Sequence, residues 1–198
     1  MKRSYLLLVC CMFLLASCCQ VKRTVKLGLS APFEGRYRDL GYEALHAVRL
    51  AVRQRNEAGG VGPGHPVELV ALNDFDEPDE AVIQAGKMAV DRDVLAVLGG
   101  WSPATARAAG EAYERLGLTF VAPPVAWSGA GFPSPAPEAD LAPDAAFVAR
   151  YTRLSGGVAP GPVALWAYAE ANRLLDAMDA AAGGQRPSRA QVAAMMAR

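Results

Sequence analysis

Ser102 has the position and the chemistry to bind an anionic group. It follows the apolar segment Val94–Leu98, which is typical of a strand, and it precedes Pro103, a residue suited to the first turn of a helix. The first backbone N–H groups of a helix have no partner within it, and together with the helix dipole they attract a carboxylate. A serine here also commonly caps its own helix. The residues alone leave both interpretations open.

Side chains suited to catalysis are scarce. The chain has two histidines, and neither His46, within a predicted helix, nor His65, in a glycine-proline turn, has an evident nucleophile beside it. The segment Gly60–Gly64 is similar in glycine content to a phosphate-binding loop, but it precedes a predicted strand instead of following one. We therefore expect neither enzymatic activity nor a cofactor.

Asp74 and Asp76 are the acidic pair that a cation site would need. They follow an apolar segment, and Asp76 stands directly before Glu77 and Pro78, where a helix start is expected. Helix capping and solvation of the loop explain the pair more simply than a bound cation does. No metal site is predicted.

Short apolar segments alternate with segments of helical spacing before residue 124. The predicted strands are Val25–Ala31, Val67–Leu72, Val94–Leu98 and Leu118–Ala122. The predicted helices begin near Gly41, Asp76 and Pro103, and the inner face of the third carries Ala104, Ala108, Ala112 and Leu116. This alternation predicts an α/β fold with a mainly parallel sheet flanked by helices. Ligands bind such sheets at the carboxyl ends of the strands, where Ser102 lies.

The remainder of the chain is predicted to be a linker followed by helices. Prolines, glycines and other small residues dominate residues 124–143. Helical spacing then returns over Ala145–Leu154 and Pro162–Ala182, and Ser188 with Gln191 is similar to a capping box that opens a short last helix. A helical C-terminus follows from these patterns.

The first residues have the pattern of an export signal. Lys2 and Arg3 precede an apolar run from Tyr5 to Leu15, which is too short for a comfortable membrane span. The tetrapeptide Leu15–Cys18 resembles a bacterial lipobox, which implies removal of residues 1–17, a lipid on the Cys18 sulfur and a short tether over residues 18–24. An ordinary signal peptide or an uncleaved anchor is the alternative, and Cys19 fits the lipobox less well. We expect an exported, membrane-anchored lipoprotein that faces the periplasm or the cell exterior.

Composition excludes several further classes. The four cysteines, Cys10, Cys11, Cys18 and Cys19, all lie in the export segment, so the body has neither an internal disulfide nor a thiolate metal site. Twenty basic and twenty acidic residues cancel, and no basic stripe indicates nucleic acid as a partner.

Several segments in series resemble one family, the branched-chain amino acid-type periplasmic substrate-binding proteins. The resemblance is carried by Val25–Gly35 with Gly41, Asn56–Val61, Val67–Val70, Asp74–Pro78 and Val97–Ser102, and in the tail by Phe147, Tyr151, Gly156-Gly157, Pro160 and Ala167–Ala169. These are the type I binding proteins of ABC importers. The resemblance implies a single Rossmann-like lobe over residues 25–198. The family would carry most of a second lobe where this chain has residues 124–143, which implies a single-lobe or truncated relative.

The resemblance also implies a ligand site, with Ser102 holding the carboxylate of the ligand in the turn that contains Trp101. The family's fourth strand often ends in Pro-Ala-Ala-Thr, whereas this chain has Pro123-Pro124-Val125-Ala126, so Pro124 and Ala126 stand at contact positions without the threonine hydroxyl. Leu40 stands where an aromatic residue commonly precedes the glycine. Trp101 and Trp127 are either aromatic walls of the site or ordinary packing.

Two functions remain open at this point. The first is a solute-binding lipoprotein that recognises a small amino acid or amide-like ligand for an ABC permease, with a second copy of the chain completing the cleft. The second is an interaction or scaffold lipoprotein, or a degenerate remnant, that binds no ligand. The intact turn Gly99–Ser102 favours the first, and the missing threonine favours the second.

Overall fold

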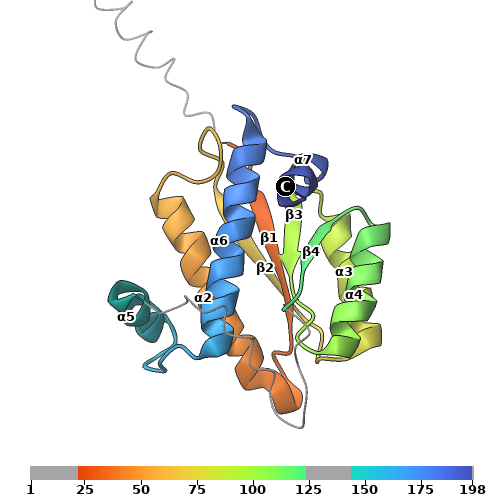
Figure 1. Cartoon of the computed structure of the whole chain (residues 1–198), viewed down its shortest axis with the longest axis vertical. Coiled ribbons are helices and arrows are strands. Elements are labelled where there is room, and N and C mark those ends of the chain that lie inside the picture. The colour runs from red at the N-terminus through yellow and green to blue at the C-terminus, as the bar shows by residue number, and fades with distance from the viewer. Residues whose placement is uncertain (1–21, 124–143, 198) are drawn as a thin grey trace, which may run out of the picture.

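Four parallel strands form one sheet in the order β2-β1-β3-β4 (Figure 1). The computed structural model describes residues 22–123 and 144–197. The strands are β1 (Val25–Ala31), β2 (Val67–Asn73), β3 (Val94–Leu98) and β4 (Thr119–Val121). This confirms the predicted mainly parallel sheet, and β1 and β3 have the predicted bounds. The predicted signal peptide and the 124–143 linker lie outside the described residues, as does Cys18.

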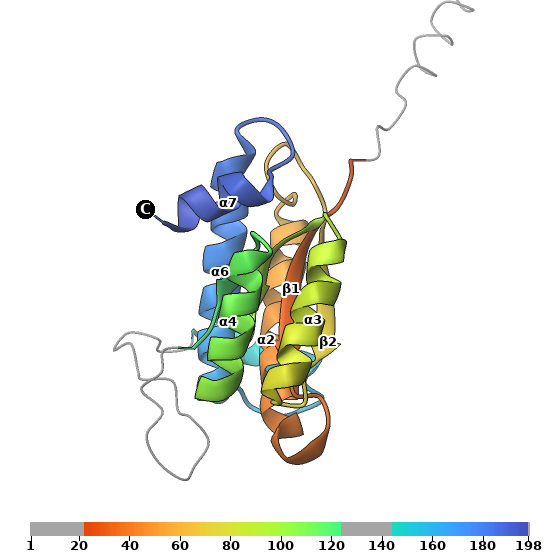
Figure 2. The same ribbon diagram turned by 90° about the vertical axis from the view of Figure 1, so that its right-hand side faces the viewer.

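Helices connect the strands and cover both faces of the sheet. After the short 3-10 helix η1 (Gly35–Tyr37) come α2 (Arg38–Glu57), α3 (Pro78–Val90) and α4 (Pro103–Arg115). The tail forms α5 (Ala145–Leu154), α6 (Pro162–Ala182) and α7 (Arg189–Met196). α2 pairs with α6, and α3 pairs with α4, as both views show (Figures 1 and 2). The predicted bounds of α5 and α6 and the capping box at Ser188 are confirmed.

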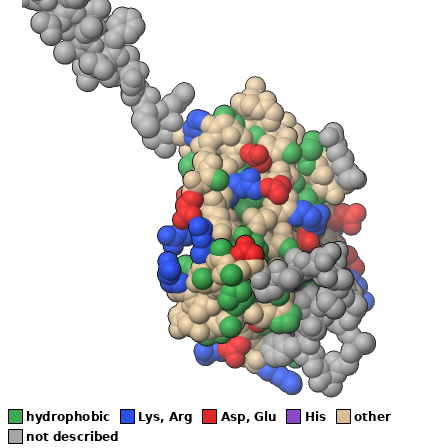
Figure 3. Space-filling model, turned by 60° about the vertical axis from the view of Figure 1, so that its left-hand side comes forward, with side chains coloured by type: hydrophobic (Ala, Val, Ile, Leu, Met, Phe, Trp, Pro, Cys, Tyr) green, Lys and Arg blue, Asp and Glu red, His purple; other side chains and the backbone are tan. Residues whose placement is uncertain are grey.

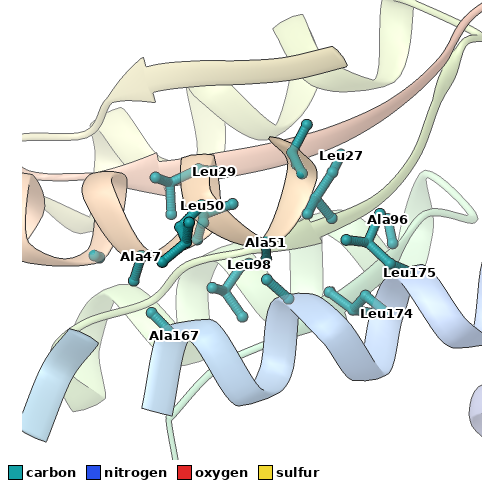
Figure 4. Packing of buried hydrophobic residues seen from close by; sticks show 14 of the residues in the cluster. Leu27, Leu29, Ala47, Leu50, Ala51, Ala96, Leu98, Ala167, Leu174 and Leu175 are labelled. Carbon is teal, nitrogen blue, oxygen red and sulfur yellow. The ribbon is translucent and has the colours of Figure 1, made fainter. Parts of the chain in front are cut away.

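The larger part of the core lies between the sheet and the α2–α6 pair. Leucines of β1 and β3 meet leucines of α2 and α6, and alanines let the two helices approach each other closely. Figure 4 shows Leu27, Leu29, Ala47, Leu50, Ala51, Ala96, Leu98, Ala167, Leu174 and Leu175 in this cluster. All five residues of β3 are buried, as expected for a strand with helices on both faces. Each leucine removed from water contributes about 1.5–3 kcal/mol.

The opposite face of the sheet packs against α3 and α4. Met88 of α3 and Tyr113 of α4 meet Val97 there, and the Tyr113 ring stacks on Phe120 at 4.8 Å. The predicted inner face of α4 is wrong except at Ala112, because Ala104 and Leu116 are exposed and Ala108 is only partly buried. The buried residues of α4 are Thr105, Ala109, Ala112 and Tyr113. The large Tyr113 ring sets which stripe of this alanine-rich helix faces inward.

The direction in which the chain is added to the sheet reverses between β1 and β3. The connection after β1 leads to β2 on one side, while β3 lies on the other side of β1, so the loops after β1 and β3 diverge. The carboxyl ends of the strands point to the lower end of the molecule in Figure 1. Of the helices over residues 22–123 and 144–197, none has the length and apolar character that crossing a membrane requires.

Candidate functional site

The turn after β3 places Ser102 at the carboxyl ends of the strands, beside the point where the strand order reverses. Gly100 has a φ of 73°, and a Cβ atom built there would lie 2.6 Å from the Ala106 Cα atom. Only glycine fits this close approach without strain. The turn therefore brings the chain directly from the end of β3 into α4, with Ser102 as the residue that precedes the helix.

Ser102 forms a complete capping box with Thr105. Its hydroxyl accepts a hydrogen bond from the Thr105 N–H at 3.3 Å, and the Thr105 hydroxyl oxygen accepts from the Ser102 N–H at 3.0 Å. Pro103 occupies the first turn, as the sequence predicts. The helix-capping interpretation of Ser102 is thus realised in the structure. The side chain is half-buried, so a ligand at this turn would meet a hydroxyl that already has protein partners.

Asp76 brings a carboxylate of the protein to the start of α4. The Thr105 hydroxyl donates a hydrogen bond of 3.1 Å to Asp76 Oδ1. Burial raises the pKa of Asp76 above its ordinary value of 3.8, while hydrogen bonds from Ser102 and Thr105 act in the opposite direction. Asp76 was predicted to cap α3, and this is wrong: Glu77 precedes α3, without a side-chain cap bond. The reason is that Asp76, with a φ of 59°, turns toward α4.

Asp74 is joined to the end of the neighbouring strand. It is 1% exposed, and its Oδ2 atom accepts a hydrogen bond of 2.7 Å from the Ser30 hydroxyl. Its Oδ1 atom accepts from the Asp76 N–H at 3.0 Å. The predicted solvation of this carboxyl in a loop is therefore wrong. Among residues 22–123 and 144–197, no group of three or more metal-ligating side chains comes together.

Trp101 and Leu40 lie beneath the loops. Each is 3% exposed. The Trp101 indole donates to the Ser30 carbonyl oxygen at 2.7 Å, and the ring meets Trp166 of α6 edge to face at 5.5 Å. Leu40, predicted in the first loop, instead lies in the first turn of α2, because Gly41 packs against the Pro32 carbonyl and brings the helix start to the end of β1. Pro124, Ala126 and Trp127 lie outside the described residues.

Four polar residues, Ser30, Asp74, Asp76 and Thr105, thus meet near Ser102. Sequence reasoning missed Ser30 and Thr105, and it considered Asp74 and Asp76 only as a cation pair or as capping and loop residues. Three of the four share a signal: Ser30 is the polar residue near the end of an apolar strand, and the two aspartates follow the next strand. In a parallel sheet these ends lie side by side. Thr105 has no comparable signal, because its partner depends on the turn that Asp76 makes.

The two histidines lie away from Ser102. His65 Nδ1 lies 2.8 Å from the Arg23 carbonyl oxygen. His46 lies between the rings of Tyr42 and Tyr151, at 6.4 and 6.2 Å, and helps to line a cavity of about 410 Å³ beside α2 and α5. Burial, with a smaller effect of Arg49, lowers the pKa of His46 below its ordinary value of 6.5.

Comparison with known proteins gives a consistent set of similarities. A family model described as "Periplasmic binding protein" matches residues 24–136. An "Amino acid binding protein" of Pseudomonas aeruginosa is 30% identical over 100 residues, which are 50% of this chain and 26% of that protein. A "Leu/Ile/Val-binding protein homolog 7" of Brucella melitensis is 30% identical over 107 residues, or 54% of this chain and 26% of that protein. The chain thus spans about a quarter of these relatives.

Two solved structures show the same pattern of coverage. One, described as a branched-chain amino acid ABC transporter from Rhodospirillum rubrum, matches with a TM-score of 0.49 and 32% identity over 52% of this chain and 30% of that one. The other is the branched-chain amino acid transporter substrate-binding protein LivJ from Streptococcus pneumoniae in complex with isoleucine. It matches with a TM-score of 0.49 and 25% identity over 54% of this chain and 30% of that one.

Proposed function

Because this chain belongs to the periplasmic binding protein family, we propose that it is a solute-binding protein of an ABC-type importer. We propose a small amino acid or amide-like ligand, which binds at the carboxyl ends of the strands. The descriptions of two relatives, an amino acid binding protein and a Leu/Ile/Val-binding protein homologue, support this ligand class. In this role the protein binds and presents a solute, and it needs neither a catalytic group nor a cofactor.

The observation that carries the proposal is the position of Ser102 after the carboxyl end of β3, where the strand order reverses between β1 and β3. It begins a helix of thirteen residues directly after a central strand, at the point where the order of the sheet reverses. Ser102 is the proposed contact to the ligand carboxylate. Trp101 and Leu40 support this wall from below, because both are buried. Pro124 and Ala126 are the proposed contacts after β4.

Asp76 limits which ligand group this wall can accept. Its carboxyl shares the hydroxyls of Ser102 and Thr105, so an arriving carboxylate must compete with it. Like charges at one site disfavour each other, and protonation of Asp76 relieves the conflict. A neutral amide oxygen meets no such repulsion. The arrangement therefore favours an amide-like group while Asp76 is ionised and admits a carboxylate once Asp76 is protonated.

The proposed setting follows from the family and from the first residues. The protein is exported and held to the membrane by a lipid on Cys18, where it delivers its ligand to an ABC permease. A second copy of the chain would supply the opposite wall of the cleft. The lipid anchor, the delivery to a permease and the second copy are all proposals, because this chain matches only about a quarter of the length of its curated relatives.

A scaffold or interaction lipoprotein without a ligand is the second candidate. Two observations favour it: the Ser102 hydroxyl already has Thr105 as a partner, and Pro124 and Ala126 offer no hydroxyl after β4. Both functions use the same fold, so binding itself must separate them.

Calorimetry and thermal shift against amino acids and their amides test the proposal, with the mass in solution measured alongside. Ser188→Ala is the matched control for Ser102→Ala, because both serines cap a helix through a capping box. Each substitution should cost about 1 kcal/mol of stability. Only Ser102→Ala should also weaken binding. A folded protein that shows no response at millimolar ligand, as monomer or dimer, would overturn the ligand-binding proposal and leave a scaffold lipoprotein or a degenerate remnant.

A further inference from the structure

A second hollow lies between α2 and α5, and its lining is basic. We call it the α2–α5 groove; it has a volume of about 240 Å³ and is lined by Leu50, Arg53 and Glu57 of α2 and by Arg150, Arg153 and Leu154 of α5. None of these residues belongs to the loops at the carboxyl ends of the strands. Figure 3 looks toward the side that carries α5, and Lys and Arg side chains gather at its left edge.

The charges in the groove do not cancel. Arg53 Nε lies 2.9 Å from Glu57 Oε1, and Arg150 Nη1 lies 3.5 Å from Glu57 Oε2, so one carboxylate is shared by two guanidinium groups. Arg153 has no ion pair with any residue in the described ranges. Three positive charges and one negative charge leave the lining at about +2, since arginine stays protonated at all ordinary pH values.

The apolar floor of the groove strengthens the electric field of these charges. Leu50 is 2% exposed and Leu154 is partly buried, which places apolar side chains behind the guanidinium groups. A hollow lined by one sign of charge with low-dielectric walls focuses the field and concentrates counter-ions. Arg53 and Arg150 remain accessible, with side chains 66% and 52% exposed.

Helix stabilisation explains only part of this arrangement. Arg153 lies in the last turn of α5, where a basic side chain interacts favourably with the helix dipole. That effect accounts for one guanidinium group. It does not account for the convergence of arginines from two helices on a single glutamate.

We propose that the α2–α5 groove binds a phosphate group, either free phosphate or the headgroup of a phospholipid. The planar guanidinium fork matches phosphate oxygens in pairs, which makes arginine the usual residue for this anion. The volume admits one phosphate with a few waters, each of which takes about 30 Å³. Glu57 holds two of the arginines in place and yields them when the anion arrives. The site is separate from the proposed amino acid site.

Titration of the purified protein with inorganic phosphate, against chloride at equal ionic strength, tests the proposal. Arg153→Gln and Arg150→Gln should each weaken phosphate binding about tenfold, because one charge-assisted hydrogen bond contributes roughly a decade of affinity. Arg107→Gln, an exposed arginine of α4, is the matched control and should change nothing. Glu57→Gln should strengthen binding, since it removes the competing carboxylate. Ser102→Ala should leave phosphate binding unchanged.

Vesicles distinguish the two sources of the phosphate group. Co-sedimentation with phosphatidylcholine vesicles that contain phosphatidic acid, but not with pure phosphatidylcholine, indicates the headgroup, provided that Arg153→Gln weakens it as it weakens phosphate binding. Binding of inorganic phosphate alone indicates the free anion. The proposal is overturned if neither probe binds, or if Arg153→Gln and Glu57→Gln respond as the unchanged protein does.

Discussion

The Ser30 hydroxyl donates a hydrogen bond of 2.7 Å to the Asp74 carboxyl, although both residues are only 1% exposed. The bond joins the ends of β1 and β2, one residue from the last aligned pair, Ala31 and Asn73. Burial is the largest influence on Asp74 and raises its pKa above 3.8, against the smaller effects of Ser30 and the Asp76 N–H. The folded chain therefore holds this proton more tightly than the unfolded chain does.

Asp74→Asn should change how stability depends on pH. With a raised pKa in the folded state, the stability that Asp74 contributes is complete below its ordinary pKa and is lost as the pH rises through the raised value. The unchanged protein should lose free energy of unfolding over that window, and Asp74→Asn should lose less and be more stable at pH 7. Urea unfolding across this pH range measures the difference. Asp79→Asn, an exposed carboxyl of α3, serves as control, and parallel curves for Asp74→Asn and the unchanged protein would refute the expectation.

Gly41→Ala and Gly86→Ala should shift stability in opposite directions. Both glycines lie inside helices, but a Cβ atom at Gly41 would stand 1.9 Å from the Pro32 carbonyl oxygen, whereas one at Gly86 would meet nothing within 4 Å. We expect Gly41→Ala to cost at least 1–3 kcal/mol, because α2 must move away from the end of β1. Gly86→Ala should gain about 0.5–1 kcal/mol through helix propensity. Thermal unfolding measures both, and a loss at Gly86 would contradict the expected contrast.

The elements were predictable because their signals are local. β3 is a continuous apolar run, and Asp144, Ser188 and Gly183 mark helix ends with ordinary cap chemistry, so the bounds of β3, α5 and α6 follow from the residues. The inner face of α4 was not predictable in the same way. Alanines occupy several sides of this helix, and the choice among them depends on the fit of the Tyr113 ring against Phe120.

The sequence predicts where the proposed site lies but not the contacts that its residues make. The turn Gly99–Ser102 marks the end of β3, and it lies beside the point where the strand order reverses. The contact of Asp76 with Thr105 depends on two backbone conformations with positive φ, 54° at Phe75 and 59° at Asp76, which non-glycine residues seldom adopt. No pattern in the sequence indicates that Asp76 turns toward α4. Its hydrogen bond with Thr105 is therefore visible only in the structure.

Trp101→Phe should destabilise the chain more than Trp166→Phe does. The two rings pack edge to face, but only Trp101 also donates a hydrogen bond, to the Ser30 carbonyl oxygen at 2.7 Å, among the described residues. Both substitutions reduce ring area, so their difference isolates the hydrogen bond, which contributes about 0.5–1.5 kcal/mol. Urea unfolding of the two variants measures that difference. Equal losses would show that Trp101 acts through packing alone.

Arg189 should be the residue that fastens α7 to the sheet. Its guanidinium group donates to three backbone carbonyl oxygens, those of Val94 at 2.8 Å, Ala89 at 3.1 Å and Asp91 at 2.6 Å. The Ala89 carbonyl lies in the last turn of α3, and the Asp91 carbonyl directly follows that helix. Neither carbonyl has an N–H partner within α3. Because the donors are spread over a planar fork, a lysine at this position cannot reach all three acceptors.

Arg189→Lys and Arg189→Gln should therefore both destabilise the chain, by about 1.5–3 kcal/mol. The loss should be concentrated in α7, whose amide hydrogens should exchange faster while those of β1 keep their protection. Arg53→Gln is the control, since Arg53 forms an exposed pair with Glu57 of the same helix at 2.9 Å, and such pairs are worth at most about 1 kcal/mol. A lysine keeps the positive charge of Arg189 but cannot form all three hydrogen bonds that join α7 to α3 and β3. If Arg189→Lys were as stable as the unchanged protein, charge alone would hold α7 in place.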